Sequence, residues 1–267
     1  MPKVVLVTGA SSGLGQAIAE YLASKNYKVY GTSRQPKFHN QNGVLFKALD
    51  VRSLPSIQKC INEIISDNKK IDVLINNAGV GITGAMEEIP TEEAKAHFDT
   101  NFFGPIQVIN TVLPYMRKEK NGLIINITSI AGHFGLPFRG MYSASKGALA
   151  LVTESYRMEL KKFNVEMLNL APGDFATNIA SGRFHSPLKD DSAYYKEYKL
   201  SLDLMDADVD NGQNPIQLAK KVYALIQKIN PKVNYTSATF LQSFSITLKQ
   251  LLPQKLFEKI LLKHYKL

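Results

Sequence analysis

Short apolar runs rich in β-branched residues alternate with longer stretches of helical periodicity, and this alternation constrains the fold of the chain more than any other feature. Several runs are apolar at every position, as parallel strands are when helices cover both faces of their sheet. The predicted strands are Val4–Thr8, Val29–Thr32, Val44–Ala48, Val73–Asn76, Leu123–Thr128, Val165–Leu170 and Lys232–Thr236. The predicted helices are Gly13–Ser24, Leu54–Asp67, Glu92–Lys118, Met141–Lys162 and Ile216–Ile229. The pattern predicts a doubly wound α/β fold with helices on both faces of the sheet.

No stretch of the 267 residues has the composition of a linker, so residues 1–267 are predicted to form one domain. Two segments differ from its regular part. Residues 176–212 mix Gly, Pro, His and acids, and a connection of this length without clear strands is typical of a substrate lid. Residues 240–267 form a C-terminal amphipathic extension. A helix that begins after Pro253 would place five residues on one apolar face, namely Leu256, Phe257, Ile260, Leu261 and Tyr265.

The charge is distributed unevenly along the chain. Lys and Arg outnumber Asp and Glu by 32 to 23, a net charge of +9, and five lysines less one glutamate in Lys249–Leu267 supply +4 of it. Because this excess is not interleaved with aromatic residues along a recognition element, the sequence argues against a nucleic-acid partner. The tail helix is expected to cap the domain with a solvated basic face. Peripheral contact of residues 250–267 with an anionic membrane is the alternative.

The number of cysteines and the N-terminal residues both help to predict the cellular compartment. Cys60 is the single cysteine, which excludes an intrachain disulfide and a cysteine-rich metal site. Only four apolar residues, Val4–Val7, precede Thr8, so a secretory signal does not fit. We therefore expect a reducing, cytoplasmic location and no metal cofactor.

The first predicted strand runs directly into a glycine-rich turn that opens the first predicted helix, Thr8-Gly9-Ala10-Ser11-Ser12-Gly13-Leu14-Gly15. Glycine lets the backbone approach a ligand, and the free N–H groups and the dipole of a helix N-terminus attract phosphate. The spacing differs from the common dinucleotide fingerprint, and an ordinary tight turn uses the same residues. In its position between strand and helix, the turn suggests a site for a nucleotide pyrophosphate.

A nucleotide site also requires a side chain that binds the ribose or its phosphate at the end of the next strand, about 20 residues further along the chain. An acid there would bind the ribose of NAD, but Ser33 stands at that place and Arg34 follows it. A guanidinium binds a phosphate dianion through paired hydrogen bonds, whereas a carboxylate would repel it. Ser33 and Arg34 therefore favour NADP(H) as the cofactor. The plain alternative for Arg34 is a solvated surface residue.

Tyr142 and Lys146 lie four residues apart and share one face of the helix Met141–Lys162. An ammonium beside a phenol favours the phenolate, which makes the tyrosine a usable acid or base. Such a pair is common on helix surfaces and means little alone. Ser129, however, stands at the carboxyl end of the strand Leu123–Thr128, where ligands bind in open α/β sheets. The three side chains together suggest a reacting site.

The chain resembles the short-chain dehydrogenase/reductase family over roughly Lys3 to Thr236, on five motifs in this order: Thr-Gly-x3-Gly-x-Gly from Thr8, Asn76-Asn77-Ala78-Gly79, Ser129, Tyr-x3-Lys from Tyr142, and Pro172-Gly173. The resemblance implies a Rossmann-like domain with a seven-stranded parallel sheet and a nicotinamide cofactor. It implies that Tyr142 is the general acid/base and that Ser129 orients the carbonyl. It further implies that Lys146 binds the nicotinamide ribose and eases ionisation of Tyr142, and that Asn101 holds a water linking Lys146 to solvent.

The resemblance also assigns residues to the cofactor. The pyrophosphate would lie along the glycine turn, the adenosine against the ends of the second to fourth strands, and the nicotinamide beside the sixth. The residues implied, together with the phosphate-binding pair of the second strand, are Gly9, Ser11, Ser12, Gly13, Leu14, Gly15, Ser33, Arg34, Asp50, Val51, Asn77, Ala78, Gly79, Tyr142, Lys146, Pro172, Gly173 and Thr177. Structural alternatives are a helix cap for Asp50, a brace between strands for Asn77 and a strand end for Pro172.

Apolar residues near the reacting groups favour a lipophilic substrate. They are Phe134, Leu136, Phe138, Met141 and Phe175, and the irregular segment adds Ile179, Phe184 and Tyr194. The resemblance adds that members acting on steroids, retinoids or acyl lipids often carry C-terminal extensions, whereas 3-oxoacyl carrier-protein reductases tend to end near the seventh strand. We therefore expect reduction of a small-molecule lipophilic carbonyl, or oxidation of the corresponding secondary alcohol.

Two other functions stay open on the sequence. One is an activity like that of the 3-oxoacyl carrier-protein reductases, and the other is a non-catalytic protein that senses NADP(H). The intact set Ser129, Tyr142 and Lys146 argues against the sensor. The resemblance further implies a homo-oligomer, a dimer or tetramer formed through the helices Glu92–Lys118 and Met141–Lys162.

Overall fold

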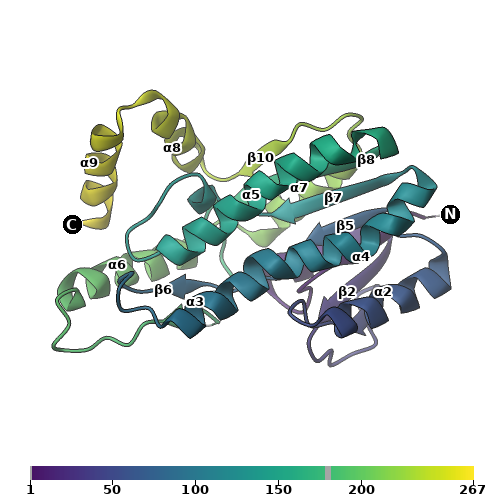
Figure 1. The fold of residues 1–267 in the computed structure, drawn as a ribbon, viewed down its shortest axis with the longest axis horizontal. Coiled ribbons are helices and arrows are strands. Elements are labelled where there is room, and N and C mark those ends of the chain that lie inside the picture. Colours follow the sequence, from purple (N-terminus) through teal and green to yellow (C-terminus); the bar gives the residue numbers. More distant parts are fainter. Residues whose placement is uncertain (1, 178–181) are drawn as a thin grey trace.

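An eight-stranded sheet forms the centre of the computed structural model, which describes residues 2–177 and 182–267 (Figure 1). Its strand order is β10-β8-β7-β5-β1-β2-β4-β3. The strands are β1 (Val4–Val7), β2 (Lys28–Ser33), β3 (Asn40–Gln41), β4 (Val44–Ala48), β5 (Val73–Asn76), β7 (Gly122–Ile127), β8 (Val165–Pro172) and β10 (Asn234–Ser237). All seven predicted strands are present. After β1 the chain first adds strands on the β2 side of the sheet and then, from β5 onward, on the opposite side of β1. Open α/β sheets bind their ligands at such a switch point.

The sheet has one strand more than the seven parallel strands that were predicted, the short β3. β3 pairs antiparallel with β4, with Gln41 opposite Val44. Asn42 and Gly43 join the two strands, and their φ angles are 51° and 80°. An Asn-Gly pair with positive φ at both residues is a common two-residue hairpin turn, because its twist matches that of the flanking strands. The hairpin adds an antiparallel edge to an otherwise parallel sheet.

Helices cover both faces of the sheet, as predicted (Figure 1). They are α1 (Gly13–Ala23) and α7 (Pro215–Ile226) on one face, and α2 (Leu54–Asn68), α4 (Gly104–Glu119) and α5 (Gly140–Leu160) on the other. Alternate residues of β1 belong to different cores: Val5 packs with α1 and α7, whereas Leu6 packs with α2 and α4. Each such fully buried side chain contributes about 1.5–3 kcal/mol to folding. Two short 3₁₀ turns, Ile130–Gly132 and Lys161–Phe163, flank α5.

The predicted helix Glu92–Lys118 is not continuous. A π-helical turn, Asp99–Phe103, joins α3 (Thr91–Phe98) to α4. Such a turn carries i→i+5 hydrogen bonds and is frequent at functional sites. The turn contains the buried Asn101, one of the predicted site residues.

Residues 176–212, predicted to lack clear regular structure, contain a strand and a helix. β9 (Phe184–His185) pairs with β6 (Ile82–Thr83), and α6 (Tyr195–Asp210) follows. The buried Tyr198 anchors α6, because its hydroxyl donates to the main-chain oxygen of Thr83 at 3.1 Å. The mixture of Gly, Pro, His and acids in this segment gave no clear helical pattern in the sequence. Residues 178–181 of this segment lie outside the described residues.

The C-terminal extension forms two helices, α8 (Phe240–Leu251) and α9 (Gln254–Tyr265). The helix expected after Pro253 is present, but Leu256 and Ile260 of its predicted apolar face are exposed, while Phe257 and Tyr265 are buried. α8 was not predicted, although Thr239 begins it with a capping box. Within residues 2–177 and 182–267, no helix combines the length and the apolar character that crossing a bilayer requires.

Candidate active site

One continuous cavity of about 1110 Å³ lies beyond the carboxyl ends of the central strands. It extends from Ser33 and Arg34, at the end of β2, to Phe257 and Tyr265 of α9. Pockets for single small ligands measure about 300–1,000 Å³, so this cavity has room for a large ligand or for two ligands side by side. Its two ends are built from different parts of the chain.

Close packing explains why two positions of the glycine turn carry no side chain. A Cβ on Gly9 would lie 2.8 Å from the Cα of Ala78, and the φ of Gly9 is +65°. A Cβ on Gly15 would overlap the main-chain oxygen of Gly9 and the amide of Asn77. Asn77 Nδ2 donates to the oxygens of Thr8 and Gly9 at 3.0 Å each. The side chain of Asn77 therefore braces the turn against the end of β5.

The start of α1 fits the pyrophosphate of a dinucleotide. Gly13, Leu14 and Gly15 of its first turn line the cavity. The first N–H groups of a helix have no intrahelical partner, and the N-cap residue Ser12 makes no side-chain capping bond to them. These donors and the helix dipole favour an anion at this place.

The end of β2 offers groups that suit a phosphate monoester. The Ser33 hydroxyl is buried and finds no hydrogen-bond partner in the part of the chain that the structure describes. Arg34 is exposed and lines the cavity, and so does Arg52, which the sequence reasoning missed. Arg52 donates through Nε and Nη2 to Asp50 at 3.3 and 3.2 Å, and these bonds hold the pKa of Asp50 below its usual value. Two guanidiniums and one unsatisfied hydroxyl, groups that suit a phosphate, thus line the same cavity.

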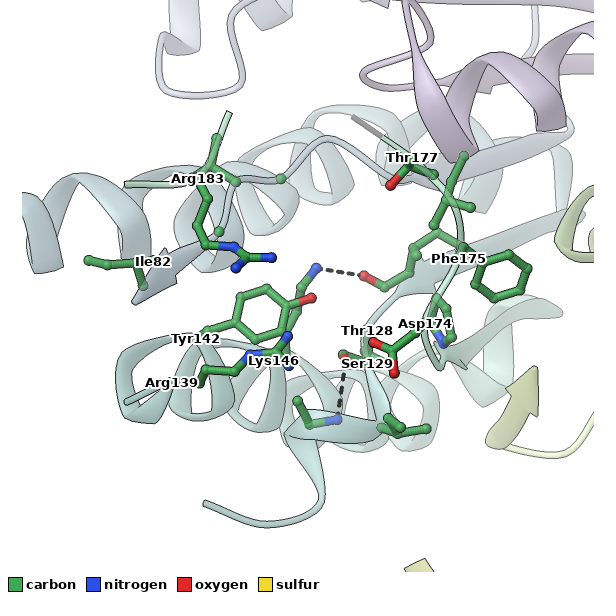
Figure 2. A pocket seen from close by; sticks show the side chains of 18 of the residues that line it. Ile82, Thr128, Ser129, Arg139, Tyr142, Lys146, Asp174, Phe175, Thr177 and Arg183 are labelled. Atoms are coloured by element: carbon green, nitrogen blue, oxygen red, sulfur yellow. Dashed lines mark hydrogen bonds between the residues drawn. The ribbon is translucent and has the colours of Figure 1, made fainter. Parts of the chain in front are cut away.

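Ser129, Tyr142 and Lys146 converge in the middle of the cavity (Figure 2). Tyr142 and Lys146 lie on successive turns of α5, and Lys146 Nζ is 6.0 Å from the centre of the Tyr142 ring. Ser129 follows β7, and its Oγ accepts a hydrogen bond from the N–H of Ala131 at 3.1 Å. This bond orients the Ser129 hydroxyl, which can still donate to a ligand. Figure 2 shows the phenol oxygen of Tyr142 directed into the cavity.

Lys146 is only 6% exposed, and one hydrogen bond fixes its ammonium. Nζ donates to the main-chain oxygen of Ile127, at the end of β7, at 2.9 Å. Burial lowers the pKa of Lys146, and the nearby Tyr142 opposes part of that effect. The two remaining protons of an ammonium can donate to hydroxyl groups of a ligand.

Asn101 is the one predicted site residue that does not line the cavity. Its Oδ1 accepts from the N–H of Val80 and its Nδ2 donates to the oxygen of Val80, both at 2.9 Å. The side chain therefore fixes the loop after β5. His97, one turn earlier, is 3% exposed and lies with its Nε2 3.0 Å from Ser145 Oγ. Burial lowers the pKa of His97 to about 4, which keeps it neutral at physiological pH.

The structure gathers all the other predicted site residues along the cavity. They are Gly9, Ser11, Ser12, Gly13, Leu14, Gly15, Ser33, Arg34, Asp50, Val51, Asn77, Ala78, Gly79, Ser129, Tyr142, Lys146, Pro172, Gly173 and Thr177. The sequence reasoning missed several polar residues that also line it, among them Arg52, Arg139, Asp174, Arg183 and Gln242. Asp174 could have been predicted from the sequence, because it directly follows the Pro172-Gly173 motif.

The end of the cavity beyond Tyr142 is largely apolar. Of the eight apolar residues predicted there, Phe134, Leu136, Phe175 and Phe184 line the cavity, whereas Phe138, Met141 and Tyr194 do not, and Ile179 lies outside the described residues. Phe138 packs on Tyr198, with 5.3 Å between the ring centres. The two tail helices supply most of the remaining apolar wall, through Leu241, Phe244, Leu248, Phe257, Ile260 and Leu261.

Metal coordination and thiol catalysis are two other kinds of chemistry that an enzyme cavity can support. Among the residues that the structure describes, no group of three or more His, Cys, Asp and Glu could hold a metal ion. The thiol of Cys60 lies in the core beneath α2, and burial raises its pKa to about 12. A thiol with so high a pKa is a poor nucleophile.

Comparisons with known proteins agree with this geometry. A family model described as short chain dehydrogenase matches residues 3–187. The 3-ketodihydrosphingosine reductase of Bacteroides thetaiotaomicron is 37% identical over 258 residues, which cover 96% of each chain. The NADPH-dependent 3-dehydrocapnine reductase of Ornithobacterium rhinotracheale is 30% identical over 280 residues, covering 99% of this chain and 98% of the other. The crystal structure of a short-chain dehydrogenase from Streptomyces avermitilis matches with a TM-score of 0.82 and 26% identity, covering 99% and 97% of the two chains.

Proposed function

Because the chain belongs to the short-chain dehydrogenase/reductase family, we propose that it is an NADP(H)-dependent oxidoreductase that interconverts a carbonyl group and a secondary alcohol on a lipophilic substrate. The observation that carries the proposal is the convergence of Ser129, Tyr142 and Lys146 in one cavity with the glycine turn. The cofactor, when bound, supplies or accepts a hydride at its nicotinamide ring.

The chain's own residues hold the carbonyl and move its proton. In reduction, the hydroxyls of Ser129 and Tyr142 donate hydrogen bonds to the carbonyl oxygen, and Tyr142 passes its proton to that oxygen as the carbon is reduced. The ammonium of Lys146 stabilises the phenolate that remains, and it donates to the nicotinamide ribose. The proton returns to Tyr142 through Lys146 and a water near the main chain of Asn101, since the Asn101 side chain is occupied by Val80.

Three features support NADP(H) over NAD(H). The end of β2 carries no acid, the Ser33 hydroxyl finds no partner within the described residues, and the cations Arg34 and Arg52 line the cavity beside it. A 2′-phosphate would satisfy the hydroxyl and both guanidiniums. The name of the Ornithobacterium relative, an NADPH-dependent reductase, is consistent with this assignment. NADP pools in cells are usually kept reduced, so we propose carbonyl reduction as the physiological direction.

A lipophilic substrate is supported by the apolar wall that α8 and α9 add beyond Tyr142. The name of the Bacteroides relative, a 3-ketodihydrosphingosine reductase, points to the same class. The apolar wall favours this function over one like that of the 3-oxoacyl carrier-protein reductases, which tend to end near the seventh strand. An NADP(H) sensor would not need the set Ser129, Tyr142 and Lys146.

The organisation of the protein follows the same proposal. We propose one domain, in which residues 176–212 act as a lid over the substrate and α9 caps the cavity. The exposed apolar residues Leu151 and Met158 on α5 support a homo-oligomer formed through α4 and α5. The single, buried Cys60 is compatible with a cytoplasmic location.

The test is a panel of carbonyl compounds and alcohols, run with NADPH/NADP and NADH/NAD in parallel. We expect reduction of long-chain ketones with NADPH. Tyr142→Phe should remove turnover and leave NADPH binding, measured by the quenching of protein fluorescence, nearly unchanged. Turnover at the wild-type rate in Tyr142→Phe would refute the mechanism, and a clear preference for NADH would refute the choice of cofactor.

A further inference from the structure

A carboxylate stands in the substrate end of the cavity without a cationic partner. Asp174 follows Pro172 and Gly173 just beyond β8 and lines the cavity. In the view of Figure 2, Asp174 lies on the same side of the pocket as Ser129 and across the pocket from Arg183. The main chain of Asp174 is fixed, because its oxygen accepts from the N–H of Gln213 at 3.0 Å. The side chain is therefore presented from a rigid strand end.

The carboxylate accepts a hydrogen bond from Gln242 Nε2 at 2.5 Å. No Lys, Arg or His nitrogen of the described residues lies within 4.0 Å of it. Burial raises the pKa of Asp174; the charges of Arg139, His264 and Arg183 offset part of that effect, and the carboxylate of Asp208 adds to it. A buried carboxylate is costly unless it is paired, and this one lies in a cavity that is open to a ligand.

The nearby arginines are engaged elsewhere. Arg183 forms an ion pair with Asp206 at 3.2 Å. The guanidinium of Arg139 lies over the ring of Tyr142, 5.2 Å from its centre. Neither cation neutralises Asp174 at hydrogen-bonding distance, so the negative charge remains available to a bound molecule.

Gln242 holds the carboxylate in one orientation. Its Oε1 accepts from the N–H of Thr239 at 3.2 Å, so its Nε2 faces Asp174. A Cβ on Gly173 would overlap Oε1 of Gln242, so this contact requires glycine there. The fixed amide donates to one carboxylate oxygen, Oδ2, and leaves Oδ1 for a ligand.

We propose that Asp174 binds an ammonium group that the substrate carries close to its reacting carbonyl, so that the substrate is a long-chain amino ketone. This inference rests on the proposed function, which places the carbonyl oxygen against Ser129 and Tyr142. The apolar wall of α8 and α9 then takes the alkyl chain. The reduction itself is unchanged: the carbonyl carbon gains a hydride from NADPH, its oxygen gains the proton of Tyr142, and the ammonium keeps its protons.

The test compares three ketones of equal chain length in the full-length protein with NADPH: a 2-amino-3-ketone, its N-acetyl derivative and the 3-ketone without nitrogen. We expect the wild type to prefer the amino ketone. In Asp174→Asn, which keeps the shape and removes the charge, kcat/KM for the amino ketone should fall on the order of tenfold to a hundredfold. The loss should appear mainly in KM, and the two uncharged ketones should change by less than about threefold.

Two controls separate the inference from other failures. Asp67→Asn, an exposed acid on α2 outside the cavity, should leave all three ketones unaffected. Thermal unfolding of Asp174→Asn should resemble that of the wild type. An equal loss on all three ketones, or a wild-type preference for the nitrogen-free ketone, would overturn the role of Asp174 and leave the proposed function standing. No reduction of any ketone by the wild type would instead overturn the proposed function.

Discussion

The ammonium of Lys146 donates a hydrogen bond to the main-chain oxygen of Ile127 at 2.9 Å, which ties the buried cation to the end of β7. This tether keeps the charge one helical turn from Tyr142. We predict that Lys146→Met, which removes the charge and keeps an apolar stem, lowers turnover on the order of 10²- to 10⁴-fold. It should also weaken NADPH binding, measured by fluorescence titration. Lys161→Met, at an exposed lysine, is the control, and wild-type turnover in Lys146→Met would contradict the assigned role.

Arg34 should decide the choice between the two nicotinamide cofactors. In Arg34→Ala the KM for NADPH should rise on the order of tenfold, because a charge-assisted contact to phosphate is lost, while the KM for NADH stays the same. Arg34→Lys should lie between the two. The control is Lys37→Ala, an exposed cation near the same strand. An equal change for both cofactors would mean that Arg34 does not contact the 2′-phosphate.

The crowding at Gly15 predicts a local defect in Gly15→Ala. Its new Cβ would overlap the oxygen of Gly9 and the amide of Asn77, so the turn must shift. We expect a loss of about 1–3 kcal/mol in the free energy of unfolding, measured with urea, and a loss of NADPH binding. Gly135→Ala is the matched control, since no atom lies within 4 Å of its Cβ position. Normal NADPH affinity in Gly15→Ala would show that the turn does not shape the phosphate site.

His97 should make the protein sensitive to acid. Its pKa is about 4 in the folded chain, against an ordinary 6.5. Above pH 6.5 it is neutral in both states, but below that pH the unfolded chain binds a proton that the folded chain does not. The resulting loss of stability grows between pH 6.5 and 4 and reaches about 3 kcal/mol.

Urea unfolding at pH 7 and at pH 5 measures this effect. His97→Gln should lose about 2 kcal/mol less than the wild type over that interval, because glutamine does not titrate. His39→Gln, at an exposed histidine, should follow the wild type. Equal losses in His97→Gln and the wild type would mean that His97 titrates normally in the folded protein.

Adjacent residues of α9 test the role of the tail. Phe257 is 2% exposed and its ring centre lies 5.1 Å from that of Phe134, whereas Leu256 is 47% exposed. Phe257→Ala should raise the KM for a long-chain ketone on the order of tenfold and have little effect with a short-chain ketone, since the lost apolar contact belongs to the wall that we propose takes the alkyl chain. Leu256→Ala should act on neither. A loss of turnover with short-chain ketones would show that Phe257 supports the reacting site itself.

The residues at the glycine-turn end of the cavity could be brought together from the sequence because they lie in short motifs at strand ends. Gly9 and Gly15 stand in one turn, and Tyr142 and Lys146 lie one helical turn apart, so local spacing already fixes their geometry. The additional strand β3 could have been predicted as well, because Asn42-Gly43 is a typical two-residue hairpin turn.

The polar residues at the other end of the cavity could not be predicted in this way. Asp174 follows β8, Arg139 precedes α5, and Gln242 lies on α8, so only the tertiary fold brings these side chains together. Helix α6 was missed because it has only weak apolar periodicity and is anchored by specific contacts such as that between Tyr198 and Thr83. Helix α8 is different, since apolar residues recur along it at helical spacing and a capping box precedes it, so its sequence did carry a helix signal.

The contact between Gln242 and Asp174 joins the tail to the end of β8 across the limit of the matched family region, which ends at residue 187. The part of the chain that the family model matches thus contains Ser129, Tyr142 and Lys146, while a separate terminal segment, residues 240–267, completes the cavity next to them. Such a division lets the terminal segment be exchanged without altering the groups that the proposed function assigns to hydride transfer. Grafting the tails of relatives onto this chain is therefore a direct route to enzymes with altered selectivity.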